Sequence, residues 1–160
     1  MSQTSAPLRE MVPGRLGLAG EPFQPSSIET KVQPAAKSFF GRAVVADIAT
    51  GEDAIKHIDT TGQKVIGVVM SSHSLVSADD GSDPGYEAKD AVKVMNKGRV
   101  WVAINEDVAV GDDVYVVHTG AGDQGKFRTD NTSADQLTNA RWIKGGTAAQ
   151  GIALLELDTL

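Results

Sequence analysis

The stretch Gly120–Lys126 (GAGDQGK) has the glycine spacing of two nucleotide-binding motifs. It matches the dinucleotide pattern G-x-G-x-x-G and comes close to the phosphate loop G-x-x-x-x-G-K-[ST]. Both motifs hold phosphate oxygens with backbone amides exposed where a glycine loop opens a helix. Here Phe127 replaces the magnesium-binding hydroxyl residue, and the residues after it favour a strand and a turn. We therefore predict a glycine-rich hairpin loop that joins two strands, Tyr115–His118 and Lys126–Thr129.

The other residues that could bind a metal ion are an acidic loop and three histidines. The loop Asp79–Asp83 (DDGSD) offers carboxylates around a glycine, as a calcium site does, but lacks the alternate-position ligands and the closing glutamate. We expect a solvated surface loop. His57, His73 and His118 stand far apart without an i, i+4 pair, which indicates surface or edge-strand histidines. The sequence predicts no metal and no cofactor.

Residues for covalent catalysis are also missing. The chain has no cysteine, which excludes thiol catalysis, a disulfide framework and a cysteine-based zinc site. It has no G-x-S-x-G nucleophile elbow, and the serines around His73 are its neighbours only in sequence. Carboxylates are plentiful, but their surroundings mark none as catalytic. We predict that the protein is not an enzyme. The alternative is a small β-barrel nucleotide hydrolase that uses Lys126 and scattered carboxylates.

Length, charge and hydropathy narrow the function classes further. The 160 residues fit one domain. A net charge of −6 with eight aromatic residues argues against nucleic-acid binding, which needs a basic groove or stacking platforms. No apolar run approaches the roughly 18 residues of a membrane-spanning helix, and the first residues lack the pattern of a signal peptide. We expect a soluble acidic protein whose partners are neither nucleic acid nor membrane.

Short strands separated by turn residues dominate the chain from residue 38 onward. Candidate strands rich in valine and isoleucine are Arg42–Asp47, Lys64–Met70, Arg99–Ile104, Val108–Val110, Asp113–His118, Lys126–Thr129, Ala140–Lys144 and Gln150–Leu157. Helical periodicity is confined to Glu52–Ile58 and Ser133–Ala140, two turns each at most. Strands of this length with glycine turns between them predict an all-β fold, a small β-sandwich or barrel that is jelly-roll-like.

Several of these strands are apolar on both faces. The pattern recurs at Arg99–Ile104, Asp113–His118 and Gln150–Leu157, and in the first of them Val100 and Trp101 take opposite faces. Such strands are either buried on both sides within the chain or have one face covered by a partner.

The first 37 residues differ from the rest in composition and charge. They hold five of the six prolines, so neither a long helix nor a central strand is expected. Four basic and three acidic residues give them +1, whereas eleven basic and eighteen acidic residues give residues 38–160 a charge of −7. We predict an extended Gly/Pro-rich arm, residues 1–37, and a core domain, residues 38–160; a flexible terminus is the alternative. Six spaced apolar residues of the arm are expected to contact another surface: Leu8, Met11, Leu16, Leu18, Phe23 and Ile28.

Four segments follow one another in a familiar order along the core. They are Phe39–Val45 (FFGRAVV), Val65–Val69 (VIGVV), Tyr86–Met95 (YEAKDAVKVM) and Lys97–Val102 (KGRVWV). Each alone is only a strand with its turn, but together they resemble the structural cement, or head-decoration, proteins of tailed phages. The resemblance covers about residues 38–157, with a matching arm before it. Lys89 departs from it at a turn where glycine is expected, and Phe39-Phe40 is bulkier than usual.

The resemblance implies a protein of the virion that binds the outer surface of the capsid after assembly in the host cytoplasm. Its partner would be the major capsid protein, whose neighbouring subunits it would bridge to stabilise the head. The resemblance also implies self-association, as a dimer or trimer. An arm with spaced anchors fits bridging, because linked contacts gain from a high effective concentration. Among virion proteins, a tail or baseplate β-module is the alternative.

Overall fold

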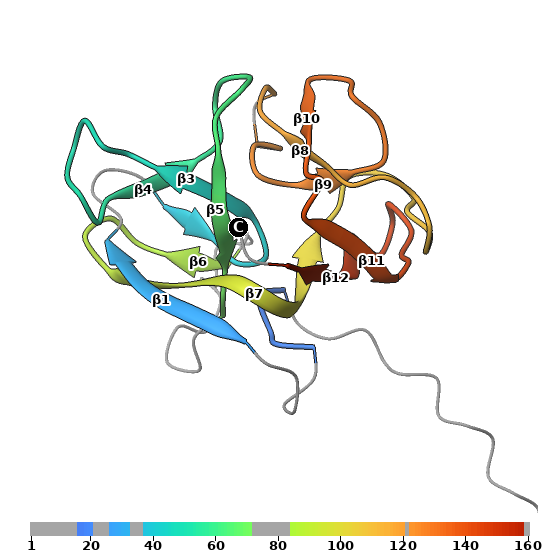
Figure 1. The fold of residues 1–160 in the computed structure, drawn as a ribbon, viewed down its shortest axis with the longest axis horizontal. Helices are drawn as coiled ribbons and strands as arrows, with labels where there is room; N and C mark the ends of the chain where they lie inside the picture. The colour runs from blue at the N-terminus through green and yellow to red at the C-terminus, as the bar shows by residue number, and fades with distance from the viewer. Residues whose placement is uncertain (1–15, 21–25, 33–36, 72–83, 121, 159–160) are drawn as a thin grey trace, which may run out of the picture.

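The computed structural model describes residues 16–20, 26–32, 37–71, 84–120 and 122–158. All helix or strand structure in these residues is β, in antiparallel sheets, which confirms the predicted all-β fold (Figure 1). In the described part of the chain there is no helix long and apolar enough to cross a membrane. The strands are β1 (Ser27–Val32), β2 (Ser38–Phe39), β3 (Ala43–Ala46), β4 (Ile55–His57), β5 (Val65–Val69), β6 (Gly85–Tyr86), β7 (Ala91–Ala103), β8 (Tyr115–Val117), β9 (Phe127–Arg128), β10 (Ala134–Gln136), β11 (Ala140–Lys144) and β12 (Ile152–Leu157).

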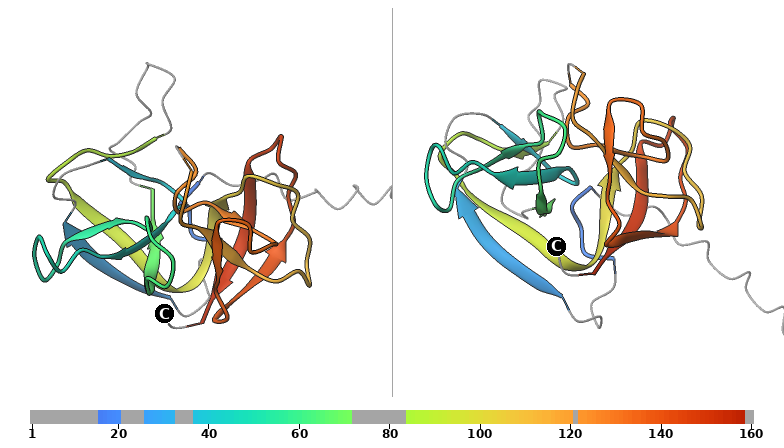
Figure 2. Two further views of the ribbon diagram at one scale, coloured as in Figure 1. Left: turned by 90° about the horizontal axis from the view of Figure 1, so that it is seen from above. Right: turned by 45° about the horizontal axis from the view of Figure 1, so that its top comes forward.

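Strand β7, thirteen residues long, connects the two halves of the molecule. The main sheet has the order β11-β12-β7-β5-β3-β4, and β1 also pairs with β7. The first half of β7 pairs with β1 and β5, and the second half pairs with β12. Between them, Gly98 has a φ of 122°, a conformation that side chains rarely adopt. Figure 2 shows β7 curving from one half of the molecule into the other.

The first half of the molecule is a small closed set of strands. The order β1-β7-β5-β3-β4 returns on itself through a parallel bridge between Val32 and Ala54, beside the start of β4. The Val32 amide donates to the Asp53 carbonyl at 2.9 Å. The short pair β2-β6 packs nearby, with Phe40 and Tyr86 edge to face at 5.4 Å. Apart from this bridge, β1 pairs with no described strand other than β7.

The second half holds β11 and β12 and the three-stranded sheet β10-β8-β9. A parallel bridge joins Ile104, just after β7, to Phe127 in β9, and an antiparallel bridge joins Val108 to Gly146. The ring of Phe127 is fully buried and meets Trp142 edge to face at 6.4 Å. These contacts hold β9 and β11 beside the C-terminal end of β7.

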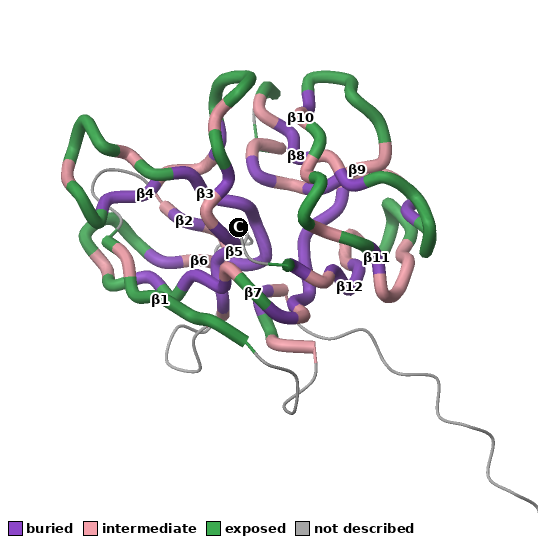
Figure 3. Tube along the Cα trace, in the orientation of Figure 1, coloured by how far each residue is buried: buried purple, intermediate pink, exposed green. Residues whose placement is uncertain are grey.

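The main hydrophobic core runs through both halves. Val68 and Met95 contribute to it from the first half, and Phe127, Trp142 and Leu155 contribute from the second. Figure 3 shows that buried residues concentrate where β5, β7 and β12 meet, whereas most of β1 is exposed. A shared core makes the two halves one cooperative unit.

The chain itself covers both faces of its two-sided apolar strands. Val100 and Val102 on one face of β7 and Trp101 and Ala103 on the other are all buried. In β12, Leu154 and Leu155 are likewise buried on opposite faces. Of the two explanations for this pattern, burial within the chain is therefore sufficient for β7 and β12, and no partner is needed to cover them.

Two described stretches of the expected N-terminal arm lie on β7. Segment 16–20 runs beside the second half of β7, where the Gly17 amide donates to the Trp101 carbonyl at 2.7 Å and the Trp101 amide donates to Leu18 at 2.9 Å. Strand β1 pairs with the first half of β7 from Ser27 to Val32. The division of the chain at residue 37 stays a prediction, but these stretches are part of the core sheet or pair with it.

Other local expectations differ from the structure. Segments 52–58 and 133–140, expected as short helices, contain strands β4 and β10 instead. Val108–Val110 is a turn whose only pairing is the bridge at Val108. The short strands β2 and β6 had no clear signal, because two residues are too few to show alternation. In each case pairing with a distant strand decides the conformation.

The turn before β7 explains why glycine is expected at position 89. Lys89 has a φ of 73°, in the left-handed region that glycine occupies without cost. The turn is fixed by the Glu87 amide, which donates to Asp90 Oδ2 at 2.9 Å, and by the Asp90 amide, which donates to the Glu87 carbonyl at 3.2 Å. The departure from the family pattern is thus accommodated by strain at one residue.

Candidate functional site

The glycine-rich loop is the predicted hairpin between β8 and β9, which pair antiparallel. Its carbonyl groups face inward: buried Arg42 donates from Nη1 to the Gly122 carbonyl at 2.7 Å and to that of Gln124 at 3.4 Å. Lys126 Nζ lies 2.8 Å from Asp123 Oδ1, and this hydrogen bond lowers the pKa of the Asp123 carboxyl. A phosphate site needs convergent amides and an available lysine. This loop offers carbonyls and a paired lysine, so its geometry does not fit a nucleotide.

His57 is a structural residue of the first half. Its Nε2 accepts a hydrogen bond from the Phe39 amide at 3.0 Å, and Nδ1 donates to the Ala43 carbonyl at 2.9 Å, which fixes a neutral tautomer. The ring stacks on Phe39 at 5.7 Å, and Arg42 lies 4.4 Å from the Phe39 ring centre on the same cluster. Desolvation lowers the pKa of His57 to about 4, and the charge of Arg42 acts in the same direction.

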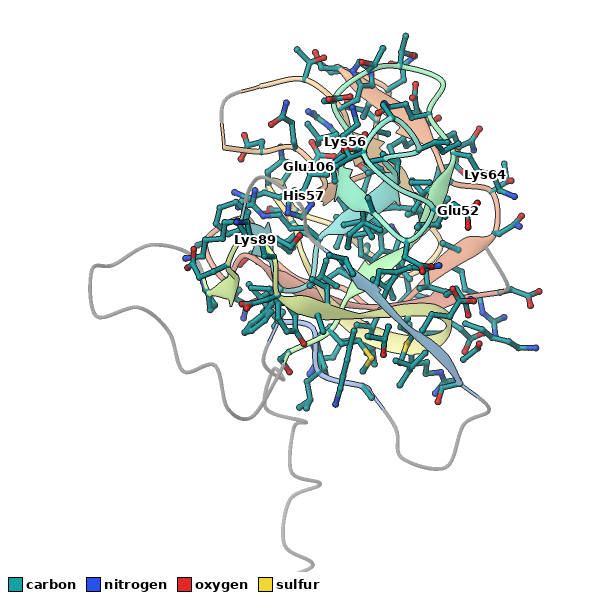
Figure 4. All side chains as sticks on the ribbon, turned by 90° about the vertical axis from the view of Figure 1, so that its left-hand side faces the viewer. Glu52, Lys56, His57, Lys64, Lys89 and Glu106 are labelled. Carbon is teal, nitrogen blue, oxygen red and sulfur yellow. The ribbon has the colours of Figure 1, made fainter. Side chains whose placement is uncertain are left out.

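The expectation of a surface or edge-strand histidine is therefore incomplete for His57. It lies in β4, at the end of the main sheet order, but both ring nitrogens are engaged inside the protein. Figure 4 labels it among the side chains of the end that carries β3 and β4. With no free nitrogen, His57 has no lone pair for a metal or for general base chemistry. His118 lies in the other half, with Nε2 3.9 Å from Asp135.

Hydrogen bonds at the surface connect the two halves of the molecule. Asp135 in β10 accepts from Thr61 Oγ1 at 2.8 Å and from the Gly62 amide at 2.6 Å, across a sequence separation of more than 70 residues. A hollow of about 430 Å³ lies beside this tie, lined by Lys64 and Gln136 among others. Among the described residues no group of three or more histidine and acidic side chains is placed to hold a metal ion.

A second surface feature is a ladder of charges across β7, β12 and β11. Glu156 accepts from Arg99 Nε at 2.7 Å and from Arg141 Nε at 2.8 Å, and the Arg99 hydrogen bond contributes most to lowering the Glu156 pKa. The ladder borders an open hollow of about 500 Å³ that also includes Lys97 and Asp158. One glutamate pairs with an arginine from each neighbouring strand, which indicates a structural tie between three strands.

The structure describes three of the six predicted arm contacts. The other three lie outside the described residues: Leu8, Met11 and Phe23. Leu16 packs, partly buried, against the smaller core cluster around Phe40. Leu18 and Ile28 are 39% and 47% exposed. The acidic loop 79–83 and His73 also lie outside the described residues.

Among the described residues, the two most exposed large apolar side chains lie where the sequence predicts no contact. Ile48, in the turn between β3 and β4, is 81% exposed, and Val110, in the connection from β7 to β8, is 66% exposed. Both sit in turns rich in acidic residues, DIATGED and EDVAVGDD. An isolated apolar residue at the centre of an acidic turn was the available signal. Val110 lies at the end of an expected strand, and Ile48 lies between the expected strand Arg42–Asp47 and the expected helical segment Glu52–Ile58.

Comparisons with known proteins identify the family of this chain. No curated protein sequence matches the chain. A chain in a solved structure titled "The capsid of Myoviridae Phage XM1" has the same fold, with a TM-score of 0.74 and 17% sequence identity over 99% of this chain and 98% of that one. The sequence model of the family described as "Structural cement protein (E217 gp24/Pam3 gp6)" matches residues 3–158. With a match over nearly its whole length, this chain belongs to the phage structural cement protein family.

Proposed function

We propose that this protein binds the outer surface of an assembled phage capsid, bridges neighbouring major capsid protein subunits and thereby stabilises the head. The family match over residues 3–158 carries the proposal. The structure adds a compact body whose two halves share one core and one long strand. Such a body transmits force between its ends, as a brace between subunits must.

The protein acts, in this proposal, without catalysing a reaction. The two features that most resembled catalytic or cofactor chemistry are engaged internally: Arg42 fills the glycine loop, and Phe39 and Ala43 occupy both nitrogens of His57. This supports a binding role over the nucleotide hydrolase. Titration with ATP, followed by calorimetry, is expected to give no heat of binding.

The N-terminal arm is proposed as one of the contacts with the capsid or with a neighbouring copy. Its predicted anchors are Leu8, Met11, Leu16, Leu18, Phe23 and Ile28. Leu18 and Ile28 support this, because each is exposed on a segment whose backbone is held on β7. Truncating a well-buried anchor at an interface costs on the order of 1–4 kcal/mol of binding free energy. Self-association as a dimer or trimer is part of the proposal.

The direct test mixes the full chain with expanded heads that lack it, from the cognate phage, and images them by electron cryomicroscopy. Added density on the outer surface, at junctions between subunits, is the expected result. The same imaging is done with a truncated variant that lacks residues 1–15, the residues before the first described contact with β7. Removing residues 1–37 would also delete β1, so it would confuse binding with folding. Bare heads, or protein that binds purified tails instead, would contradict the proposal.

A further inference from the structure

Two turns at opposite ends of the molecule each present one large apolar side chain to solvent. The Ile48 turn (residues 47–53) joins β3 to β4, and the Val110 turn (residues 106–113) leads from β7 toward β8. Figure 1 places the two connections at the two ends of the longest axis, and the views in Figure 2 agree. Ile48 and Val110 are 81% and 66% exposed, whereas no other exposed large apolar side chain of the described residues exceeds 47%.

Hydrogen bonds hold the Ile48 turn in one shape. The Asp47 carbonyl accepts from the Thr50 amide at 2.9 Å and from the Gly51 amide at 3.2 Å, and Asp47 Oδ2 accepts from Thr50 Oγ1 at 2.7 Å. The Asp47 amide donates to the Ala54 carbonyl at 2.8 Å, which closes the base of the turn. The exposure of Ile48 is thus built into an ordered turn, and little conformational entropy is lost when such a turn binds.

The Val110 turn is fixed in a comparable way. Asp112 Oδ2 accepts from the Ala109 amide at 2.8 Å, and the Asp112 amide donates to the Ala109 carbonyl at 3.2 Å. Below the tip, Val108 exchanges two backbone hydrogen bonds with Gly146, at 2.9 and 3.1 Å. Val108 is buried, so the turn rests on the core and only its tip projects.

Acidic side chains surround both tips. The Ile48 turn contains three acidic residues and the Val110 turn contains four, and neither contains a lysine or arginine. From outside the turns, Lys31 lies 3.5 Å from Asp53 and Arg128 lies 2.9 Å from Glu106, so one carboxylate at each end is paired. Glu52 and Asp53 beside one tip, and Asp112 and Asp113 beside the other, are exposed; Figure 4 looks onto the first end and labels Glu52. A single exposed apolar residue is ordinary on a protein surface. An ordered apolar tip with an acidic rim, repeated at both ends, specifies a complementary surface of opposite charge.

We propose that the Ile48 turn and the Val110 turn are two separate contact points, each of which inserts its apolar tip into a socket on a capsid protein subunit, with lysine and arginine at the rim of the socket. The inference rests on the proposed function and names the surfaces that would carry the bridging. Because β7 and the shared core fix the separation of the two turns, one molecule reaches two subunits. Two moderate contacts then give strong retention through effective concentration.

The test measures binding of labelled protein to undecorated heads by sedimentation, for Ile48→Ser, Val110→Ser and the double variant. We expect each single variant to bind roughly 10-fold more weakly and the double variant roughly 100-fold or more, because truncating a buried apolar anchor removes most of its contribution. Val32→Ser is the matched control, an exposed valine outside both turns; the substitution keeps the backbone amide that donates to Asp53, and the variant is expected to bind as the unmodified chain does. Thermal unfolding of each variant checks that the fold is retained.

A second arm identifies the partner at each end. The chain has no cysteine, so Ala49→Cys and Ala109→Cys each provide one attachment point for a photo-crosslinker beside a tip. Cross-links from both positions to the major capsid protein are the expected result. The rim charges are tested with Glu52→Gln and Asp113→Asn, which should make binding less sensitive to salt.

The outcomes separate this inference from the proposed function. If the unmodified chain decorates heads and the double Ile48→Ser, Val110→Ser variant binds equally well, the two turns are not the contact points and the proposed function stands. Cross-links from only one of the two ends would also overturn the two-ended arrangement. If the unmodified chain does not bind heads at all, the proposed function itself fails.

Discussion

His57 shows how a single buried residue ties stability to pH. Its pKa is about 4 in the folded protein and near 6.5 in an unfolded chain, so below pH 6.5 the unfolded state binds more protons. Stability is therefore lost as the pH falls from 6.5 toward 4. The shift corresponds to about 3 kcal/mol in total, of which about 2 kcal/mol falls between pH 7 and pH 5. Urea unfolding at these two pH values measures the loss.

The control for this prediction is His57→Gln, which keeps a donor and an acceptor but does not titrate. The free energy of unfolding of this variant should change much less between pH 7 and pH 5. Carboxyl groups with lowered pKa values, such as Asp123 and Glu156, act at lower pH and leave this interval largely untouched. Equal losses in the variant and the unmodified chain would show that another group is responsible.

Lys89 gives a second prediction at the level of one residue. Its φ of 73° costs an ordinary side chain on the order of 1 kcal/mol, which glycine avoids. Lys89→Gly is therefore expected to raise the free energy of unfolding by about 1 kcal/mol. The larger entropy of glycine in the unfolded chain offsets part of this gain. Lys89→Ala, which removes the same side chain but keeps the strain, serves as the control. Unfolding in urea that ranks the glycine variant no higher than the alanine variant would contradict this account.

Among the elements, segment 16–20 tests whether the N-terminal part of the chain belongs to the core. Gly17 has a φ of 71°, and a Cβ there would lie 2.5 Å from the Ser71 nitrogen and 2.7 Å from the Val69 oxygen. Gly17→Ala should therefore release the segment from β7. We expect the free energy of unfolding to fall by at least about 2 kcal/mol, because alanine must adopt a left-handed conformation there and its Cβ clashes with the backbone. Hydrogen exchange should show a less protected Trp101 amide, because its acceptor is Leu18.

Gly151→Ala is the matched control, since Gly151 has a similar φ of 67° but open space where the Cβ would be. Its loss of stability measures the cost of the left-handed backbone alone, without the clash that a Cβ makes at Gly17. A Gly17→Ala variant no less stable than Gly151→Ala, with the Trp101 amide still protected, would mean that segment 16–20 does not depend on this contact.

The elements also show what the sequence could and could not predict. The runs that became β3, β5, β11 and β12 are apolar and bounded by turns, so local pattern was enough. The segment that contains β4 was misread because Ala54, Ile55 and Ile58 have helical spacing, while its pairing with β3 depends on tertiary structure. The same limit applies to Arg42, whose partner Gly122 lies 80 residues away. A contact between residues so far apart in the chain produces no pattern in the local sequence.

For the whole molecule, the decisive feature is that one chain buries its own two-sided strands. The sequence allowed either internal burial or a partner over one face, and β7 and β12 are covered from within. Among the residues that the structure describes, five large apolar side chains stay exposed, and Ile48 and Val110 are the most exposed of them. A body whose halves share one core suits a structural role, and family membership points the same way.

The central claim is that the protein stabilises phage heads by binding them. The most direct measurement heats DNA-filled heads that lack the protein, with and without a saturating amount of the purified chain, and follows DNA release with a fluorescent dye. Cementing predicts that release moves to a higher temperature in proportion to the sites occupied. Heads that are fully decorated but release DNA at the same temperature as bare heads would contradict the claim.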